Sequence, residues 1–291
     1  MDELTLKLIQ LDHCRGISRK TITAFLKADP DLNQIADYTL NDLTDFFHLK
    51  RVHAERFIQD YHAFYPDQAV RYYEQRDIYP VPIHSSWYPT YLKKIYDPPY
   101  VLYTKGKRIR LKDRKMLSVV GTRHPSPEAK KIIERLVLPL IESGWTIISG
   151  LASGIDGMAH ELALSGRTIA VLGSGLFFPY PHQNIDLFHT LTAEQLVISE
   201  YPPPSRPERW RFPERNRVIS GLSLGTLVIE ARERSGSLIT ADQALEQGRE
   251  VMAVPGSILK ENSRGTNRLI QMGAKMVIDS SDIIEELRIY E

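Results

Sequence analysis

From residue 116 onward the chain alternates short apolar runs with amphipathic segments. The apolar runs are rich in Val and Ile: MLSVVG (116–121), WTIISG (145–150), TIAVLGSG (168–175), QLVISEY (195–201), TLVIEA (226–231), EVMAVPG (250–256) and AKMVID (274–279). Continuous runs of this kind are typical of strands buried on both faces. Helical segments between successive strands favour a parallel sheet. We therefore expect an α/β fold with a Rossmann-like, mostly parallel, doubly wound sheet.

The first part of the chain is predicted to be helical. Apolar residues recur at helical spacing in LTLKLIQLDH (4–13), SRKTITAFLKA (18–28) and LNDLTDFFHL (40–49). We expect a small all-α domain over residues 1–77, resembling a SAM or helix-hairpin-helix unit, with Gly16 at a turn between two helices. A turn glycine is also needed by any packed helical pair, and that is the reading we favour. Residues 78–115 are expected to be an extended connector leading a domain over 78–291.

Composition narrows the class of protein. Apolar residues make up 42% and charged residues 25% of the chain, and Cys14 is the single cysteine. A single cysteine permits neither an internal disulfide nor a thiolate metal cluster, which fits a reducing compartment. The start, MDELTLKLIQ, lacks a signal peptide, and no apolar run approaches the ~18 residues of a membrane span. We expect a soluble, cytoplasmic protein.

The net charge of +1 does not identify a partner. Residues 1–80 hold 10 Lys and Arg against 13 Asp and Glu, and the remainder holds 27 against 23. Any basic surface must therefore come from local clustering.

Glycine-rich turns follow several of the predicted strands. In such a sheet, ligands bind beyond the carboxyl ends of the strands, at helix N-termini. The turns are GTR (121–123), SGLASG (149–154), GSG (173–175) and SGS (235–237). Each offers backbone N–H groups to an anion, and Arg123 adds a cation. One such turn is usually a plain connection, but several on one edge together with an arginine favour a phosphate-bearing ligand.

An arginine cluster follows the fourth of these strands. The segment SRPERWRFPERNRVISG (205–221) holds five arginines, interleaved with Trp210 and Phe212. Arginine makes bidentate contacts with phosphate, and aromatic rings stack on unpaired bases. By itself the segment also fits a charged surface loop with a buried Trp anchor. Its position beside the glycine turns favours a groove for a chain of phosphates.

Common catalytic and cofactor motifs are absent from the sequence. Neither the dinucleotide fingerprint nor Walker A is present. GLSLG (221–225) lies between a predicted helix and a strand, the reverse of a nucleophile elbow. No metal-ligand spacing is evident, so we expect no metal and no cofactor. Asp156 is expected to cap a helix, and Glu230 is the acid to watch for hidden catalysis.

The ordered set of motifs resembles the DNA-processing protein DprA (Smf) family over roughly residues 78–291. The carrying segments include VVGTRHPSP, GWTIISGLASGIDGMAH, TIAVLGSGLFFPYPHQN, ISEYPPPSRPERWRFPERNRVISGLS and VIEARERSGSLITADQALEQGREVMAVPGS. The resemblance implies a mediator rather than an enzyme. It implies a protein that binds single-stranded DNA in the bacterial cytoplasm, loads the RecA recombinase during natural transformation and relieves inhibition by single-strand binding protein. Many members continue into a C-terminal winged helix after the point where this sequence stops.

The resemblance also assigns roles to individual residues. It implies that Arg123 binds phosphate and that Arg206 is a basic DNA contact, whereas His182 stands where some members carry lysine. A homodimer is implied, with Asn267, Ile270 and Met276 near its contact. Together with the turns and the arginine cluster, the expected DNA-binding residues are Gly121, Thr122, Arg123, Ser149, Gly150, Ala152, Ser153, Gly154, His182, Arg206, Arg209, Arg211, Arg215, Asn216, Arg217, Ser235, Gly236 and Ser237.

Two other functions stay open at this point. The first is a nucleotide-binding phosphoribohydrolase-like enzyme, whose P-G-G-x-G-T signature is reduced here to PGS (255–257), with GTN (265–267) standing alone. The second is an interaction scaffold without nucleic acid. The sequence does not show the recombinase-contact surface, the role of the N-terminal helices or whether double-stranded DNA binds.

Overall fold

The computed structural model describes residues 1–287, which form two compact units. The first, here called the helical unit, comprises residues 1–85 and 99–102. The second, called the sheet unit, comprises residues 86–98 and the described residues from 103 onward. Within the described residues, no helix is both long enough and apolar enough to cross a bilayer.

The helical unit is built from α1 (Glu3–His13), α2 (Arg19–Ala28), α3 (Arg51–Ala63) and α4 (Pro66–Glu74), with the short turns η1 (Ile35–Asp37) and η2 (Asp42–Phe46) and the strand β1 (Ile78–Pro82). Side-chain caps start two of the helices: Asp2 accepts from the Thr5 amide, and Ser18 and Thr21 form a reciprocal capping box. Phe25 lies at the core, 4.7 Å from the ring of Phe47.

The helices predicted from residues 4–13 and 18–28 are confirmed, but the one predicted over 40–49 is wrong. Only η2 forms there, a single π-helical turn. Thr39 donates both its amide and its hydroxyl to the Asp42 carboxylate, which fixes where the turn starts. His48 has φ +54°, a left-handed conformation that ends it. Local side-chain bonds therefore override the helical periodicity.

The sheet contains nine strands in the order β1-β2-β6-β5-β4-β3-β7-β8-β9. Their bounds are β2 (Val101–Gly106), β3 (Met116–Val120), β4 (Thr146–Ser149), β5 (Arg167–Leu172), β6 (Leu196–Ser199), β7 (Gly225–Val228), β8 (Glu250–Ala253) and β9 (Lys275–Met276). Pairings from β6 to β9 are parallel, and β2 pairs antiparallel with β6. The predicted mostly parallel α/β fold is confirmed. The segment expected to be an extended connector instead supplies β1 and β2.

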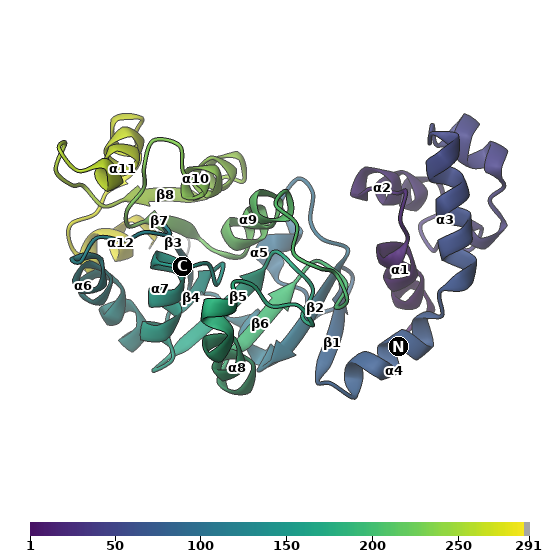
Figure 1. Ribbon diagram of the computed structural model, residues 1–291, viewed down its shortest axis with the longest axis horizontal. Helices are drawn as coiled ribbons and strands as arrows, with labels where there is room; N and C mark the ends of the chain where they lie inside the picture. The colour runs from purple at the N-terminus through teal and green to yellow at the C-terminus, as the bar shows by residue number, and fades with distance from the viewer. Residues whose placement is uncertain (288–291) are drawn as a thin grey trace. The chain divides into compact units, whose positions relative to one another are not determined.

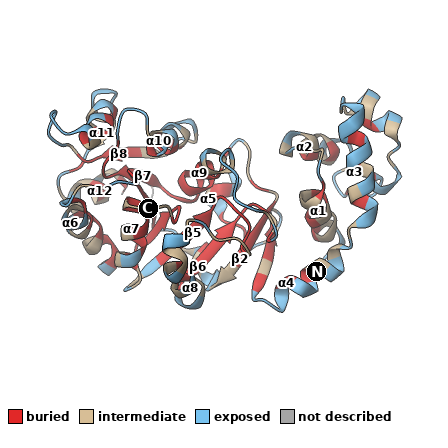
Figure 2. Cartoon of the chain, viewed as in Figure 1, coloured by how far each residue is buried: buried red, intermediate tan, exposed pale blue. Residues whose placement is uncertain are grey.

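Helices cover both faces of this sheet (Figure 1). They are α5 (Thr90–Lys93), α6 (Ala129–Glu142), α7 (Ile155–Ala163), α8 (Ile185–Glu194), α9 (Arg211–Leu222), α10 (Gly236–Glu246), α11 (Glu261–Gln271) and α12 (Ser280–Leu287), with 3-10 turns η3 (Arg108–Lys112) and η4 (His182–Asn184). One core joins α6, α7 and α12 to β3, β4, β7 and β8. On the other side of the sheet, α9 and α10 pack on each other and on β5 and β7. The inner strands β3, β4, β6 and β7 are buried along their whole length (Figure 2).

The order of the strands creates a switch point between β3 and β7. From β3 the chain proceeds to β4, β5 and β6 on one side, and then returns to place β7, β8 and β9 on the other. In parallel α/β sheets, ligands bind at the carboxyl ends of the strands flanking such a point. The turns that follow β3, β4 and β7 therefore mark the edge to inspect.

The start of α6 differs from the sequence prediction. The segment SPEAKKIIERLVLPLIESG (126–144) predicts a helix with Ser126 as its N-cap, Pro127 as its first residue and Gly144 at its end. In the structure α6 begins at Ala129, with Glu128 at the cap position. Ser126 instead donates its amide to Glu230, at 2.9 Å, and its hydroxyl to the same carboxylate. Gly144, at φ +81°, follows the end of this helix as predicted.

A buried histidine in α7 gives the sheet unit a pH dependence. The Thr168 hydroxyl donates to the Ile147 carbonyl at 2.8 Å, so it accepts from His160 Nδ1 at 2.7 Å. This arrangement leaves Nε2 as the unprotonated nitrogen. Burial lowers the pKa of His160 to about 3.

Because the pKa of His160 is lower in the folded state, protonation favours unfolding. Its contribution to stability is complete above about pH 6.5 and is lost as the pH falls toward 3, reaching a loss of about 2 kcal/mol at pH 5. We expect His160→Leu to flatten the difference in unfolding free energy between pH 7 and pH 5, measured by urea titration. His182→Leu, at an exposed position, is the control. An unchanged pH dependence in His160→Leu would contradict this assignment.

Candidate nucleic-acid interface

The turns after β3 and β4 lie against each other at the switch point. Gly154 has φ +79°, and a Cβ there would lie 2.4 Å from the Thr122 carbonyl oxygen and 2.9 Å from the Arg123 Cα. The Ile155 amide donates to the same carbonyl at 3.2 Å. A residue with a side chain would separate the two turns, so glycine is required here. The predicted GTR and SGLASG turns are therefore brought together.

This junction offers one cation and several N–H donors to a ligand. Arg123 is exposed, and no ion pair or hydrogen bond engages its side chain within residues 1–287. The amides of Arg123, Ser153 and Gly154 likewise donate to no acceptor in this part of the chain. Backbone amides in turns of this kind form concave anion sites. The geometry suits a phosphate held by amides and by one arginine.

A buried arginine supports the turn after β4 from beneath. Arg215 of α9 is 4% exposed and donates Nη1 to the Gly150 carbonyl, at 2.6 Å, and to the Val171 carbonyl. A Cβ at Gly150 would lie 2.6 Å from the same guanidinium group, so the glycine makes room for the arginine. Arg215 was predicted to contact DNA. Its position inside the protein assigns it to holding the turn instead.

Asp156 completes this buried group. Its carboxylate accepts from the Gly150 amide at 3.1 Å, across the turn from the Arg215 contact. Burial raises the pKa of Asp156, and the charge of Arg215 and the Gly150 amide partly offset that effect. Asp156 was expected to cap a helix; Gly154 holds the N-cap position of α7, and Asp156 caps the preceding turn.

Asn216 connects this turn to the one after β7. Its side chain accepts from Arg215 Nε at 3.2 Å and donates to the Gly236 carbonyl at 3.2 Å. Ser235 and Ser237 share a hydrogen bond between their hydroxyls at the start of α10. The three turns are thus held in one framework, here called the rim: residues 121–123, 150–154 and 235–237.

Exposed arginines and aromatic rings come from the segment after β6. Arg206 and Arg209 are exposed, and Arg206 lies 5.2 Å above the ring of Phe178. Arg211 is half-buried and braces the segment, with Nη1 bonded to the Arg206 carbonyl at 2.7 Å and Nη2 paired with Glu208 at 2.9 Å. Trp210 is 55% exposed. Cations beside open aromatic faces are the arrangement that binds unpaired bases.

Arg217 is the second arginine of the cluster that lies inside the protein. It is 5% exposed, with Nη2 bonded to Glu200 and Nε 3.2 Å from the Asp97 carboxylate. Two acidic partners neutralise its charge, so it is assigned to the packing of α9. The 3.6-residue helical period would have placed Arg217 on a buried face. The dense run of charges makes that period hard to recognise in the sequence.

Several hydroxyls and glycines of the predicted site are also engaged inside the protein. Ser149 donates to the Val119 carbonyl at 2.6 Å, and Thr122 accepts from the His124 amide at 3.2 Å. The GSG turn after β5 is covered, because Phe212 packs on Gly173 and the carbonyls of residues 202 and 203 approach Gly175. Ala152 is half-buried on the rim.

Sequence reasoning missed Asn184, which positions the rim. Its amide donates to the carbonyls of Leu151 and Ala152, both at 3.0 Å. His182, two residues earlier, is exposed. The signal was present in YPHQN, where an asparagine stands at the end of a proline-rich turn. Such residues commonly hydrogen-bond to nearby backbone.

Glu230 has a structural role. Its carboxylate accepts from the Ser126 amide and hydroxyl and from Asn262 Nδ2 at 3.0 Å. Asn262 also donates to the His124 carbonyl at 2.9 Å. Glu230 therefore holds the segment between β3 and α6 in place.

The predicted dimer residues lie at the far edge of the sheet. Met276 is on the edge strand β9 and is 48% exposed, near the more exposed Met272 and Ile278 in sequence. Asn267 hydrogen-bonds to both the amide and the carbonyl of Gly256, at 3.1 and 2.9 Å. Ile270 is half-buried.

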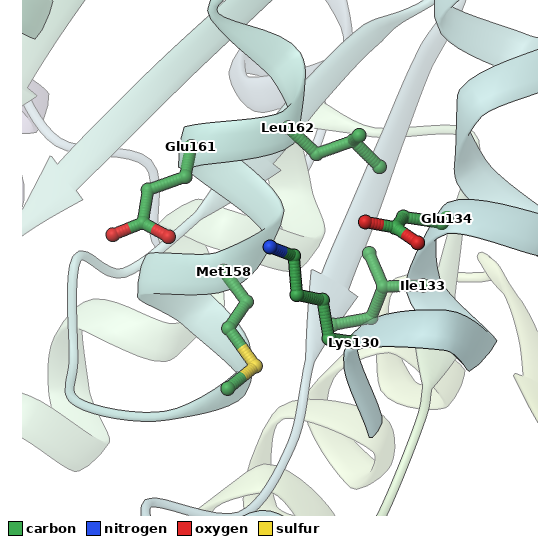
Figure 3. A pocket seen from close by; sticks show the side chains of 6 residues that line it. All are labelled: Lys130, Ile133, Glu134, Met158, Glu161 and Leu162. Atoms are coloured by element: carbon green, nitrogen blue, oxygen red, sulfur yellow. The ribbon is translucent and has the colours of Figure 1, made fainter. Parts of the chain in front are cut away.

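A hollow of about 250 Å³ between α6 and α7 lies outside the rim. Figure 3 shows Lys130 between Glu134 and Glu161, with Ile133, Met158 and Leu162 around them. Two carboxylates against one ammonium give this hollow a negative balance, which does not suit a phosphate.

Substitutions should distinguish an arginine that supports the turn after β4 from an exposed arginine that is free to contact a ligand. Arg215→Met leaves the Gly150 and Val171 carbonyls and Asp156 without their cation, so we expect the free energy of unfolding to fall by about 3 kcal/mol. Arg123→Ala removes an exposed side chain and should change it by less than about 0.5 kcal/mol. Urea denaturation monitored by tryptophan fluorescence measures both. Equal effects of the two substitutions would show that the assignment of roles is wrong.

The amino-acid sequence of this chain is similar to that of known proteins. Residues 80–288 match the family described as DNA recombination-mediator protein A. The chain is 41% identical over 275 residues to the DNA processing protein DprA of Bacillus subtilis, covering 93% of this chain and 91% of that one. It is 47% identical over 201 residues to DprA of Streptococcus pneumoniae, covering 68% and 71% of the two chains.

Solved structures of similar proteins share the fold of this chain. The X-ray structure of DprA from Streptococcus pneumoniae superposes with a TM-score of 0.85 at 36% identity, covering 98% of this chain and 99% of that one. A DNA processing protein A from Helicobacter pylori, studied for its single-stranded DNA binding mode, superposes with a TM-score of 0.66 at 29% identity, covering 72% and 95%. This chain belongs to the DprA/Smf family of DNA recombination-mediator proteins.

Proposed function

We propose that this chain binds single-stranded DNA along the rim. The observation that carries the proposal is the junction of Arg123 with the Ser153–Gly154 turn, where a cation and unused amides converge. Arg206 and Arg209 extend the positive charge beyond one phosphate, and Trp210 offers a ring to a base. The described binding of single-stranded DNA by the Helicobacter pylori relative supports the same ligand.

The bound strand is then delivered to a recombinase. Membership of a recombination-mediator family supports transfer of the strand to RecA and relief of inhibition by single-strand binding protein. The protein acts by holding and presenting the strand, and no chemical step is assigned to it. RecA filament formation on a strand coated with single-strand binding protein tests this role: no acceleration by the chain would contradict it.

A homodimer would place two rims on one strand. The exposed edge strand β9 and the apolar side chains of Met272, Met276 and Ile278 support self-association there. Sedimentation equilibrium of the wild type and of Met276→Asp measures it. Dissociation into monomers by the substitution is the expected result, and a monomeric wild type would contradict the proposal.

The alternative of a phosphoribohydrolase-like enzyme gains no support from the site. Its P-G-G-x-G-T signature is incomplete in the sequence, and Glu230, the acid to watch for hidden catalysis, has three donors on its carboxylate. We therefore do not propose it.

The salt dependence of binding tests the proposed interface. We expect a labelled oligothymidylate of about 20 nucleotides to bind with log Kd rising linearly with log[salt]. For ~4–6 neutralised phosphates the slope is about 3 to 4, and Arg123→Ala with Arg206→Ala should lower it by about 1.4. Fluorescence anisotropy at several salt concentrations gives both values.

A matched control removes two cations from the helical unit. Lys27→Ala with Arg71→Ala makes the same change in net charge at exposed positions of α2 and α4. We expect its affinity and slope to equal those of the wild type. If the wild type binds with no salt dependence, or if the control loses as much affinity as the rim variant, the rim is not the interface.

A further inference from the structure

A second hollow of the sheet unit lies at the opposite edge of the sheet. Its volume is about 620 Å³, and its lining includes the residues just before β3 and just before β7. Met116 and Leu224 stand at these amino ends, joined by a backbone hydrogen bond of 3.0 Å. The rim follows the carboxyl ends of the same strands. Five residues of β3 separate the two places, about 16 Å of extended chain.

The hollow combines an apolar floor with a basic border. Leu111, Met116, Leu222, Leu224 and Tyr88 line it and are buried. Exposed cations surround them, one directly after α5 and the others at and after the end of η3: Lys94, Lys112, Arg114 and Lys115. The segment 105–115, KGKRIRLKDRK, holds seven bases and one acid. The positive charge therefore extends along the chain beyond the hollow.

The one acid in the lining does not cancel this charge. Asp113 accepts a hydrogen bond from the Thr146 hydroxyl and lies 3.5 Å from Arg167 Nη1. Arg167 is not among the residues that line the hollow, so it offsets the carboxylate from outside. The lining cations are left with a positive balance. A hollow with this balance attracts an anion.

Aromatic side chains accompany the cations. Trp87, between the lining residues Ser86 and Tyr88, is 40% exposed, and Lys112 Nζ lies 5.1 Å from the centre of its ring. Lys112 also donates to the Ser86 carbonyl, which fixes it beside this ring. Tyr96, two residues after Lys94, is 97% exposed. An exposed aromatic ring beside a lysine offers a base a stacking face next to a cation for its phosphate.

We propose that this hollow is a second site for single-stranded nucleic acid, separate from the rim. Lys94, Lys112 and Arg114 contact backbone phosphates, and Trp87 stacks on a base at the border of the apolar floor. Long cations beside aromatic faces are the shared chemistry of proteins that bind unpaired strands without reading sequence. One protomer then holds two segments of nucleic acid, at opposite edges of the same sheet. The inference deepens the proposed function and rests on it for the class of ligand.

A nucleic acid fits these observations better than an acidic peptide does. An acidic peptide would use the cations, but its carboxylates do not require exposed aromatic rings. The basic segment continues from the hollow through η3, which matches a polymer with a charge on every unit. The acidic peptide is therefore an outcome that the test must detect.

Photo-crosslinking of the full chain separates the two sites. The probe is an oligothymidylate of about 20 nucleotides carrying 5-iodouracil, longer than the ~4–16 nucleotides that one fold contacts. Peptide mapping should find crosslinks at Trp87 as well as at Trp210, the exposed aromatic residue of the segment after β6. Lys94→Glu with Arg114→Glu should reduce the Trp87 crosslink at least about tenfold and leave the Trp210 crosslink. Arg123→Ala with Arg206→Ala should reduce the Trp210 crosslink and leave the Trp87 crosslink.

The controls make each result decisive. Lys27→Glu with Arg71→Glu changes the net charge equally at exposed sites of the helical unit and should leave both crosslinks. The proposal is overturned if the wild type crosslinks only at the rim, or if the Lys94 and Arg114 reversals leave the Trp87 crosslink intact. It is also overturned if an oligoglutamate peptide binds the hollow and the nucleic acid does not. If the wild type gives no crosslink at either site, the proposed function itself is contradicted.

Discussion

The buried guanidinium group of Arg215 is the interaction on which the rim depends. It binds the carbonyls of Gly150 and Val171 below the turn after β4, while Asp156 binds the Gly150 amide. Asn216 accepts a hydrogen bond from Arg215 and donates one to the Gly236 carbonyl, which links this group to the turn after β7. Gly150 is held through both its carbonyl and its amide, whereas the Ser153 and Gly154 amides of the same turn have no acceptor within residues 1–287. A buried cation is costly unless it is satisfied, and the Arg215 guanidinium group is satisfied by two backbone carbonyls, the Asn216 side chain and the nearby charge of Asp156.

This arrangement divides the arginines of α9 and the segment before it into two groups. Arg206 and Arg209 are exposed and available to a ligand, whereas Arg215 and Arg217 are enclosed by protein groups. The enclosed pair fixes α9 against the sheet, and Arg211 braces the exposed pair through the Arg206 carbonyl. In the proposed interface, the backbone at Arg206 is held before a flexible polyanion binds, which lowers the entropy lost on binding.

The sequence was sufficient to predict the alternation of strands and helices, the parallel sheet and the edge where the turns meet. Those features follow from apolar periodicity and from short-range turn chemistry. It was not sufficient to distinguish a buried arginine from an exposed one, because both occur in one dense run of charges. Arg215 is buried because Gly150, 65 positions earlier, leaves room for it. The helix predicted over 40–49 failed for a local reason, the Thr39–Asp42 hydrogen bonds.

Hydrogen exchange of the rim amides, with and without oligothymidylate, tests the central claim most directly. The amides of Arg123, Ser153 and Gly154 have no protein acceptor in the described chain, so they should exchange rapidly in the free protein. On binding a strand they should become protected, while α12, on the sheet face of α6 and α7, should be unchanged. If tight binding leaves these three amides unprotected, phosphates do not sit on the rim and the account is wrong.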